Sequence, residues 1–80
     1  MPVMRFPDRK TVERLRGTYP PGTVVELVRM ADDFAPPPGT RGVVYGVDDT
    51  GSLLVHWANG SGLNVLYGID EVRKITEKGR

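Results

Sequence analysis

The spacing of apolar residues near the start of the chain predicts a helix. In "DRKTVERLRGTYP", Val12, Leu15 and Tyr19 recur at intervals of three and four residues, so they fall on one side of a helix. Asp8 or Thr11 is placed to cap its N-terminus, and the two prolines after the stretch prevent its continuation. We therefore expect one helix between Asp8 and Tyr19.

After this helix the apolar period changes to two residues, which is the period of a strand. Alternating apolar and polar residues, separated by glycine, proline and aspartate, predict short strands that begin near Thr23, Gly42, Ser52 and Gly62. A fifth strand surrounds Val72, and "YGID" before it predicts one tight helical turn. Five short, bent strands describe a small barrel. The expected fold is mainly β, an SH3-like five-stranded small barrel with one N-terminal helix.

The motif "PPGT" occurs twice, at residues 20–23 and 37–40, and each copy precedes a predicted strand. Two prolines give a stiff approach, and the glycine is free to take a positive φ. We interpret Gly39 and Gly42 as corner residues of the barrel. Exposed loops on a rigid scaffold often carry binding residues, so three residues of the same loop are interpreted as contacts. These are Phe34, Pro36 and Arg41.

Strand alternation assigns side chains to two faces of the predicted sheet. Trp57 shares the parity of the core positions, so we expect it to be buried rather than to stack on a ligand. The opposite parity predicts an exposed, largely apolar patch, which usually has a cover or a partner. The pattern leaves open whether the helix covers this patch or closes one end of the barrel. The expected core is Val25, Leu27, Val44, Leu53, Val55 and Leu63, and the patch is Val43, Tyr45, Leu54 and His56.

Composition excludes several kinds of site. The chain has no cysteine and a single histidine, so disulfides, thiolate metal sites and multi-histidine sites are impossible. Adjacent carboxylates such as Asp48 and Asp49 are interpreted as residues that cap turns, because neighbours on a strand point to opposite faces. His56 has no partner in any catalytic motif. We expect no metal, no cofactor and no enzymatic activity.

Length and hydropathy define the organisation. Eighty residues form one small domain, for which we expect residues 8–76, with residues 1–7 and 77–80 as flexible tails. No apolar run is long enough to span a bilayer, and the basic start is not followed by the apolar stretch of a signal peptide. A cytoplasmic location is therefore expected.

Charge is unevenly distributed although the net value is +1. The first twenty residues have an excess of positive charge, and the remainder has an excess of negative charge. A basic segment can contact phosphates, and aromatic side chains can stack on bases. Nucleic-acid binding is therefore the alternative function. The contacts expected in that case are Arg5, Arg9, Lys10, Arg14, Arg41 and Tyr67.

Several stretches in order, "YPPGTVVELVRM", "APPPGTRGVV" and "GVDDTGSLLVHWANGSGLNVL", resemble a small domain-of-unknown-function family, DUF4314. The resemblance covers roughly Thr11 to Ile75. It implies an SH3-like barrel and a bacterial setting, often a phage or mobile element. It implies no catalytic residue.

These observations predict a non-enzymatic binding module of phage or mobile-element type that acts through contacts with a protein. The partner is not identified by any motif, and we expect a monomer or a weak homodimer. The apolar outer face supplies contact area, and the proline loop supplies its rim. The predicted binding residues are Phe34, Pro36, Arg41, Tyr45, Leu54 and His56.

Overall fold

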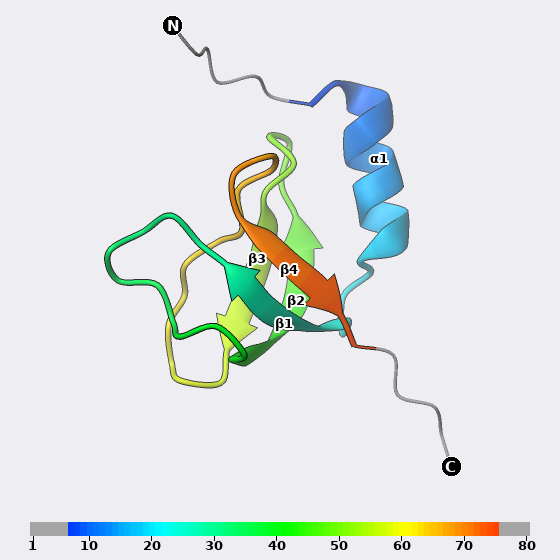
Figure 1. The fold of residues 1–80 in the computed structure, drawn as a ribbon. Coiled ribbons are helices and arrows are strands. Elements are labelled where there is room, and N and C mark those ends of the chain that lie inside the picture. The colour runs from blue at the N-terminus through cyan, green and yellow to red at the C-terminus, as the bar shows by residue number, and fades with distance from the viewer. Residues whose placement is uncertain (1–6, 76–80) are drawn as a thin grey trace, which may run out of the picture.

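The computed structural model describes residues 7–75, as one helix followed by four antiparallel strands (Figure 1). The strand order is β3-β2-β1-β4, so β1 lies between β2 and the last strand of the chain. The mainly β fold with one N-terminal helix is confirmed, and the sheet is open. Residues 1–6 of the first predicted tail, the second predicted tail of residues 77–80 and residue 76 of the predicted domain fall outside the described residues. The elements are α1 (Arg9–Thr18), β1 (Val24–Arg29), β2 (Arg41–Val47), β3 (Leu53–Trp57) and β4 (Glu71–Lys74).

Helix α1 begins and ends as the sequence predicts. The Thr11 N–H donates to the Asp8 carboxylate at 2.9 Å, so Asp8 is the N-cap. The predicted stripe faces the sheet: Val12 is buried, and Leu15 and Tyr19 pack against the core. Within residues 7–75 there is no helix with the length and apolar character needed to cross a membrane.

The two "PPGT" copies form the same turn. In each copy the threonine N–H and hydroxyl donate to the carbonyl oxygen of the first proline, with a hydroxyl distance of 2.6 Å at both Thr23 and Thr40. The glycines have positive φ, 96° at Gly22 and 95° at Gly39. This is the backbone that a Pro-Gly turn requires before a strand, so the predicted role of the motif is confirmed.

The core lies between the inner face of the sheet and α1. Five of the six predicted core residues are buried, and Trp57 is buried with them. Leu63 is only partly buried, so its prediction as a core residue is wrong. The buried apolar residues are Val12, Val25, Leu27, Val44, Val47, Leu53, Val55, Trp57 and Val65.

The strand predicted from Gly62 is reduced to one bridged residue, Val65, which exchanges two 2.9 Å hydrogen bonds with Leu53. The segment before Val65 bonds elsewhere: the Trp57 indole N–H donates to the Leu63 carbonyl oxygen at 2.8 Å. The Trp57 backbone N–H donates to the Ser61 carbonyl oxygen at 3.1 Å. Because these carbonyl groups close a turn around Trp57, they are not available to a regular ladder. The described sheet therefore has four strands rather than five.

A bulge in β2 changes which side chains are buried. The pairing with β3 shifts between Val44 and Gly46, so two residues of β2 face one residue of β3. Strict alternation from Val44 would turn Val47 outward, but both valines are buried. Tyr45, which lies between them, stays on the outer face.

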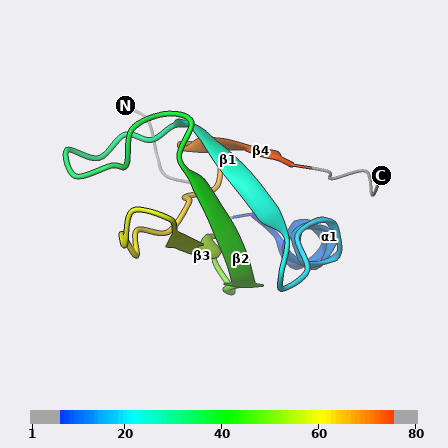
Figure 2. The ribbon, with the colours of Figure 1, turned by 90° about the horizontal axis from the view of Figure 1, so that it is seen from below.

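Helix α1 and the loop of residues 30–40 lie at opposite ends of β1 and β2 (Figure 1, Figure 2). Both views show the loop extending away from the strands and the helix standing beside them. Because the helical stripe joins the core, α1 occupies the inner side. This decides the alternative that the sequence left open: α1 does not cover the outer face of β2 and β3.

Candidate functional site

An aromatic pair forms the centre of the outer face of β2 and β3. The rings of Tyr45 and His56 are stacked, with centroids 4.2 Å apart and an interplanar angle of 21°. Val43 lies opposite His56 in the ladder, and Leu54 lies opposite the bulge. Tyr45 is 48% exposed and Val43 is 42% exposed, whereas Leu54 is half-buried. We call Val43, Tyr45, Leu54 and His56 the outer patch; the structure brings together all four residues that the sequence placed there.

The outer patch is held rigidly. The β2–β3 ladder fixes the backbone at both strands, and the stacked rings restrict each other's rotation. Such a surface loses little conformational entropy when a partner binds.

An ion pair borders the outer patch on the neighbouring strands. The Arg73 guanidinium donates to the Glu26 carboxylate at 2.9 and 3.2 Å, joining β4 to β1. Val28 of β1 adds a further apolar side chain, which is 39% exposed. The sequence prediction did not include these residues, although the outward parity of Glu26 was a sufficient signal. They continue the outer face across the sheet.

The proline loop separates its three predicted contact residues. Phe34 is 85% exposed, and its N–H donates to the Asp32 carboxylate at 2.7 Å, which fixes the turn before it. Pro36 is buried, so its ring is not available to a partner. Arg41 is exposed and opposes Glu26, so it lies at the edge of the outer face. Of the predicted rim, Phe34 and Arg41 present side chains to a partner.

Comparison with known families identifies the family of this chain. The model of DUF4314, described as a domain of unknown function, matches residues 8–75. The chain belongs to the DUF4314 family. Searches of curated proteins and of solved structures gave no match. The family prediction is thus confirmed.

The DUF4314 domain does not bring the predicted nucleic-acid contacts onto one surface. Arg9, Lys10 and Arg14 are exposed on α1, where Arg9 forms an ion pair with Glu13 at 3.8 Å. Arg41 lies on the outer face, on the other side of the sheet. Tyr67 is 44% exposed beside a pocket near Leu15. The sixth predicted contact, Arg5, is outside the described residues.

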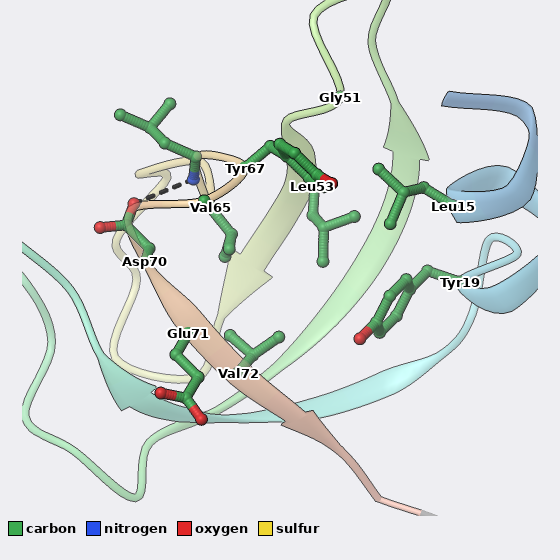
Figure 3. Close-up of a pocket in the computed structure, with 11 residues that line it drawn as sticks. Leu15, Tyr19, Gly51, Leu53, Val65, Tyr67, Asp70, Glu71 and Val72 are labelled. Carbon is green, nitrogen blue, oxygen red and sulfur yellow. Dashed lines mark hydrogen bonds between the residues drawn. The ribbon is translucent and has the colours of Figure 1, made fainter. Parts of the chain in front are cut away.

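The DUF4314 domain contains a pocket that the sequence analysis missed (Figure 3). Its volume is about 150 Å³, and it lies between α1, the start of β3 and the segment that leads into β4. It was missed because it combines residues from three distant segments, which no short motif joins. Figure 3 shows the side chains of Leu15, Tyr19, Leu53 and Val72 directed toward one space. The pocket is lined by Leu15, Tyr19, Gly51, Leu53, Val65, Leu66, Tyr67, Gly68, Asp70, Glu71 and Val72.

Two aspartates with lowered pKa values cap local structure. Burial opposes ionisation of Asp48, but hydrogen bonds from Thr50 and Ser52 outweigh it and lower the pKa of Asp48. The hydrogen bond from Thr11 lowers the pKa of Asp8 at the start of α1. The predicted turn-capping role is confirmed for Asp48. Asp49 instead forms an ion pair with Arg16 at 3.0 Å.

Two observations on the described residues concern acid–base and metal chemistry. His56 is exposed and stacked on Tyr45 rather than bonded to a carboxylate. Across residues 7–75, no three histidine, aspartate or glutamate side chains gather closely enough to hold a metal ion. The outer patch instead presents apolar and aromatic side chains to the surface.

Proposed function

We propose that this DUF4314 domain is a non-enzymatic binding module that contacts a partner protein through the outer patch. The observation that carries the proposal is the position of α1. The only helix of residues 7–75 packs on the inner side, so the stacked Tyr45 and His56 have no cover there. Exposed apolar patches with a polar border are typical of protein interaction sites.

The patch has the chemical composition of an interface centre. Tyrosine supplies a large apolar area with few rotatable bonds, and it is enriched among residues that dominate binding energy. Val43 and Leu54 extend the apolar area on either side of the rings. Arg41 and the Glu26–Arg73 ion pair provide a polar border, which orients a partner more than it strengthens binding. Binding would bury the rings and leave the border in contact with water.

Nucleic-acid binding is less well supported. A phosphate backbone needs several cations along one path, but Arg41 begins β2, whereas Arg16 of α1 bonds to Val47 at the opposite end of this strand. Asp49 also neutralises Arg16 on the side of α1. No specific observation favours this function, and it serves as the contrasting outcome of the experiment below.

We further propose that the four strands have the arrangement of an SH3-like barrel. Two features support this interpretation. β1 pairs with both β2 and β4, and a helical turn immediately precedes β4, where Ile69 and Asp70 donate to the Leu66 carbonyl oxygen at 3.2 and 3.0 Å. A bacterial setting on a phage or mobile element stays a prediction from the family resemblance, and a cytoplasmic location stays a prediction from the hydropathy of the sequence.

The proposed function is tested by capture with matched variants. Tagged wild-type chain, Tyr45→Ala and Tyr67→Ala are exposed to lysate from cells that carry the gene, with and without nuclease. The two tyrosines have similar exposure, 48% and 44%, but only Tyr45 belongs to the outer patch. Thermal melting confirms that each variant is folded. Partners identified with the wild type are then purified and titrated.

We expect a partner protein whose capture is unaffected by nuclease treatment. It should bind Tyr45→Ala at least about tenfold more weakly than the wild type, and Tyr67→Ala with the affinity of the wild type. Its affinity should depend weakly on salt, because few ion pairs form at the patch. Equal affinities for the two variants would contradict the proposal. So would a bound species lost on nuclease treatment with a steep salt dependence, which would instead indicate phosphate contacts.

A further inference from the structure

The free edge of β4 faces the pocket. The Ile75 N–H donates to the Val24 carbonyl oxygen at 2.8 Å, so Ile75 directs its backbone groups toward β1. Because these groups alternate along an antiparallel strand, Arg73 also faces β1. The N–H and C=O groups of Val72 and Lys74 therefore point the other way. β4 is the last strand of the sheet, so within residues 7–75 no strand pairs with that side.

The pocket adjoins this edge and is suited to an apolar side chain. Glu71 and Val72 of β4 line one side, and residues 65–68 line another. Leu15 of α1 and Tyr19, the C-cap residue of this helix, close the third side, as Figure 3 shows. The volume of about 150 Å³ equals that of an engineered apolar cavity that binds benzene, so one leucine or valine side chain fits.

The charges at the pocket have one sign. Among residues 7–75, its only charged lining residues are Asp70 and Glu71. The Asp70 carboxylate accepts hydrogen bonds from the backbone N–H groups of Ala31 and Leu66 at 3.0 and 2.9 Å, which fixes it beside the pocket. Glu71 approaches Arg29 only at 3.6 Å and remains half exposed. A bound segment that carries a lysine or arginine near its apolar residue would complement these carboxylates.

We propose that the free edge of β4 and the adjoining pocket bind an extended segment of a partner protein by strand addition. The segment bonds to the backbone of Val72 and Lys74, places one apolar side chain in the pocket and directs a basic side chain toward Glu71. Strand addition uses main-chain bonds for affinity and side-chain pockets for specificity. This site is separate from the outer patch and goes beyond the proposed function.

The ends of β4 restrict what can be added. The Lys74 ammonium group donates a hydrogen bond to the Thr18 carbonyl oxygen at 2.8 Å, so this cation is directed toward the end of α1. β4 contains only four residues, and short edges with charged residues resist indiscriminate pairing. The edge therefore selects a segment whose side chain fills the pocket, rather than any exposed strand.

The test is a titration of the ¹⁵N-labelled full chain with a peptide, acetyl-Lys-Thr-Leu-Thr-Val-Thr-amide. Its lysine, leucine and valine share one face of a strand. Two derivatives carry N-methyl groups, one at the lysine, leucine and valine, the other at the three threonines. Alternate N–H groups point to opposite edges of a strand, so only one derivative loses the bonds to β4.

We expect amide shifts to concentrate at residues 66–74, with the amides of Val43 and Tyr45 unchanged. One N-methylated peptide should bind about tenfold more weakly than the other, because it cannot form the edge hydrogen bonds. Leu66→Lys should also weaken binding about tenfold, since it places a cation at the pocket. Val28→Lys is the matched control, because the exposures of Leu66 and Val28 are 40% and 39%.

Several results would overturn the proposal. They are equal affinity for the two N-methylated peptides, shifts centred on the outer patch, and no binding at millimolar peptide. Binding that appears only after residues 1–6 are removed would make the chain's own N-terminal segment the occupant. Shifts of Val72 and Lys74 that depend on protein concentration without peptide would make a second copy the occupant. The proposed function is judged separately, by the capture experiment with Tyr45→Ala and Tyr67→Ala.

Discussion

Gly42 lies where the packing of β2 against β3 leaves no room for a Cβ atom. A Cβ atom there would lie 2.5 Å from Val55 Cγ1 and 2.7 Å from Trp57 Cε3. Both neighbours belong to the core and are almost completely buried, so neither can move freely. The glycine is therefore required by the close approach of β3 to β2.

Gly42→Ala should lower the free energy of unfolding by about 1–3 kcal/mol, because an added methyl group strains a packed core. Gly62→Ala is the control: nothing lies within 4 Å of its added Cβ, so its effect should stay within about 0.5 kcal/mol. Urea denaturation measures both. A Gly42→Ala protein as stable as the control would show that the contact between these strands is looser than described.

Asp48 links stability to pH. Its carboxylate accepts hydrogen bonds from Thr50 and Ser52, and its pKa is lowered in the folded protein. The folded state therefore binds fewer protons than the unfolded state near this pKa, and stability rises with pH. The contribution is complete above the ordinary aspartate pKa of about 4 and is lost as the pH falls through the lowered value.

Asp48→Ala should thus destabilise the protein at neutral pH and destabilise it less at about pH 3. The free energies of unfolding of the two proteins, measured across this range, give the difference directly. Asp48→Asn keeps an acceptor oxygen without the charge, so its free energy of unfolding at neutral pH should lie between those of the wild type and Asp48→Ala. A difference that is constant from neutral to acidic pH would mean that the ionised carboxylate is not what stabilises the turn.

At the scale of elements, the proline loop combines two roles that the sequence did not separate. Pro36 is buried, whereas Pro37 is exposed and accepts the hydrogen bonds of the following turn at its carbonyl oxygen. The repeated "PPGT" identified the turn because its backbone requirement is local. The burial of Pro36 depends on the tertiary structure around the loop, which local sequence does not encode.

Pro37→Ala should cost about 1 kcal/mol or less, because it only increases the freedom of the unfolded chain. Pro36→Ala should cost about 2 kcal/mol, because it also removes buried methylene groups. Chemical denaturation of the two variants compares these costs. Equal costs would indicate that the buried ring contributes no packing energy.

Regular elements were predictable where one residue type repeats with one period. The stripe of α1 and the alternation of β1, β2 and β3 gave their positions and most of the core. Alternation failed at Val47, because the β2 bulge reverses parity, and at the strand expected from Gly62, because backbone groups there bond around Trp57. The pocket could not be predicted, since its walls come from three separate segments.

At the scale of the whole molecule, the side on which α1 packs decides which surface is available. The residues of the outer patch were predictable from period two, but their exposure was not. A stripe of three apolar residues fits either side of a sheet equally well. Only the tertiary structure places it inside, with the Tyr45–His56 stack left on the surface. We propose that this surface contacts a partner protein.

The most direct measurement is photo-crosslinking from single positions. The amino acid p-benzoylphenylalanine replaces Tyr45 in the outer patch, or Arg14 on the exposed side of α1, and the protein is irradiated in lysate from cells that carry the gene. We expect one dominant protein adduct from position 45 that survives nuclease treatment, and no such adduct from position 14. The same adduct from both positions, or a nucleic-acid adduct from position 14 alone, would contradict the proposal.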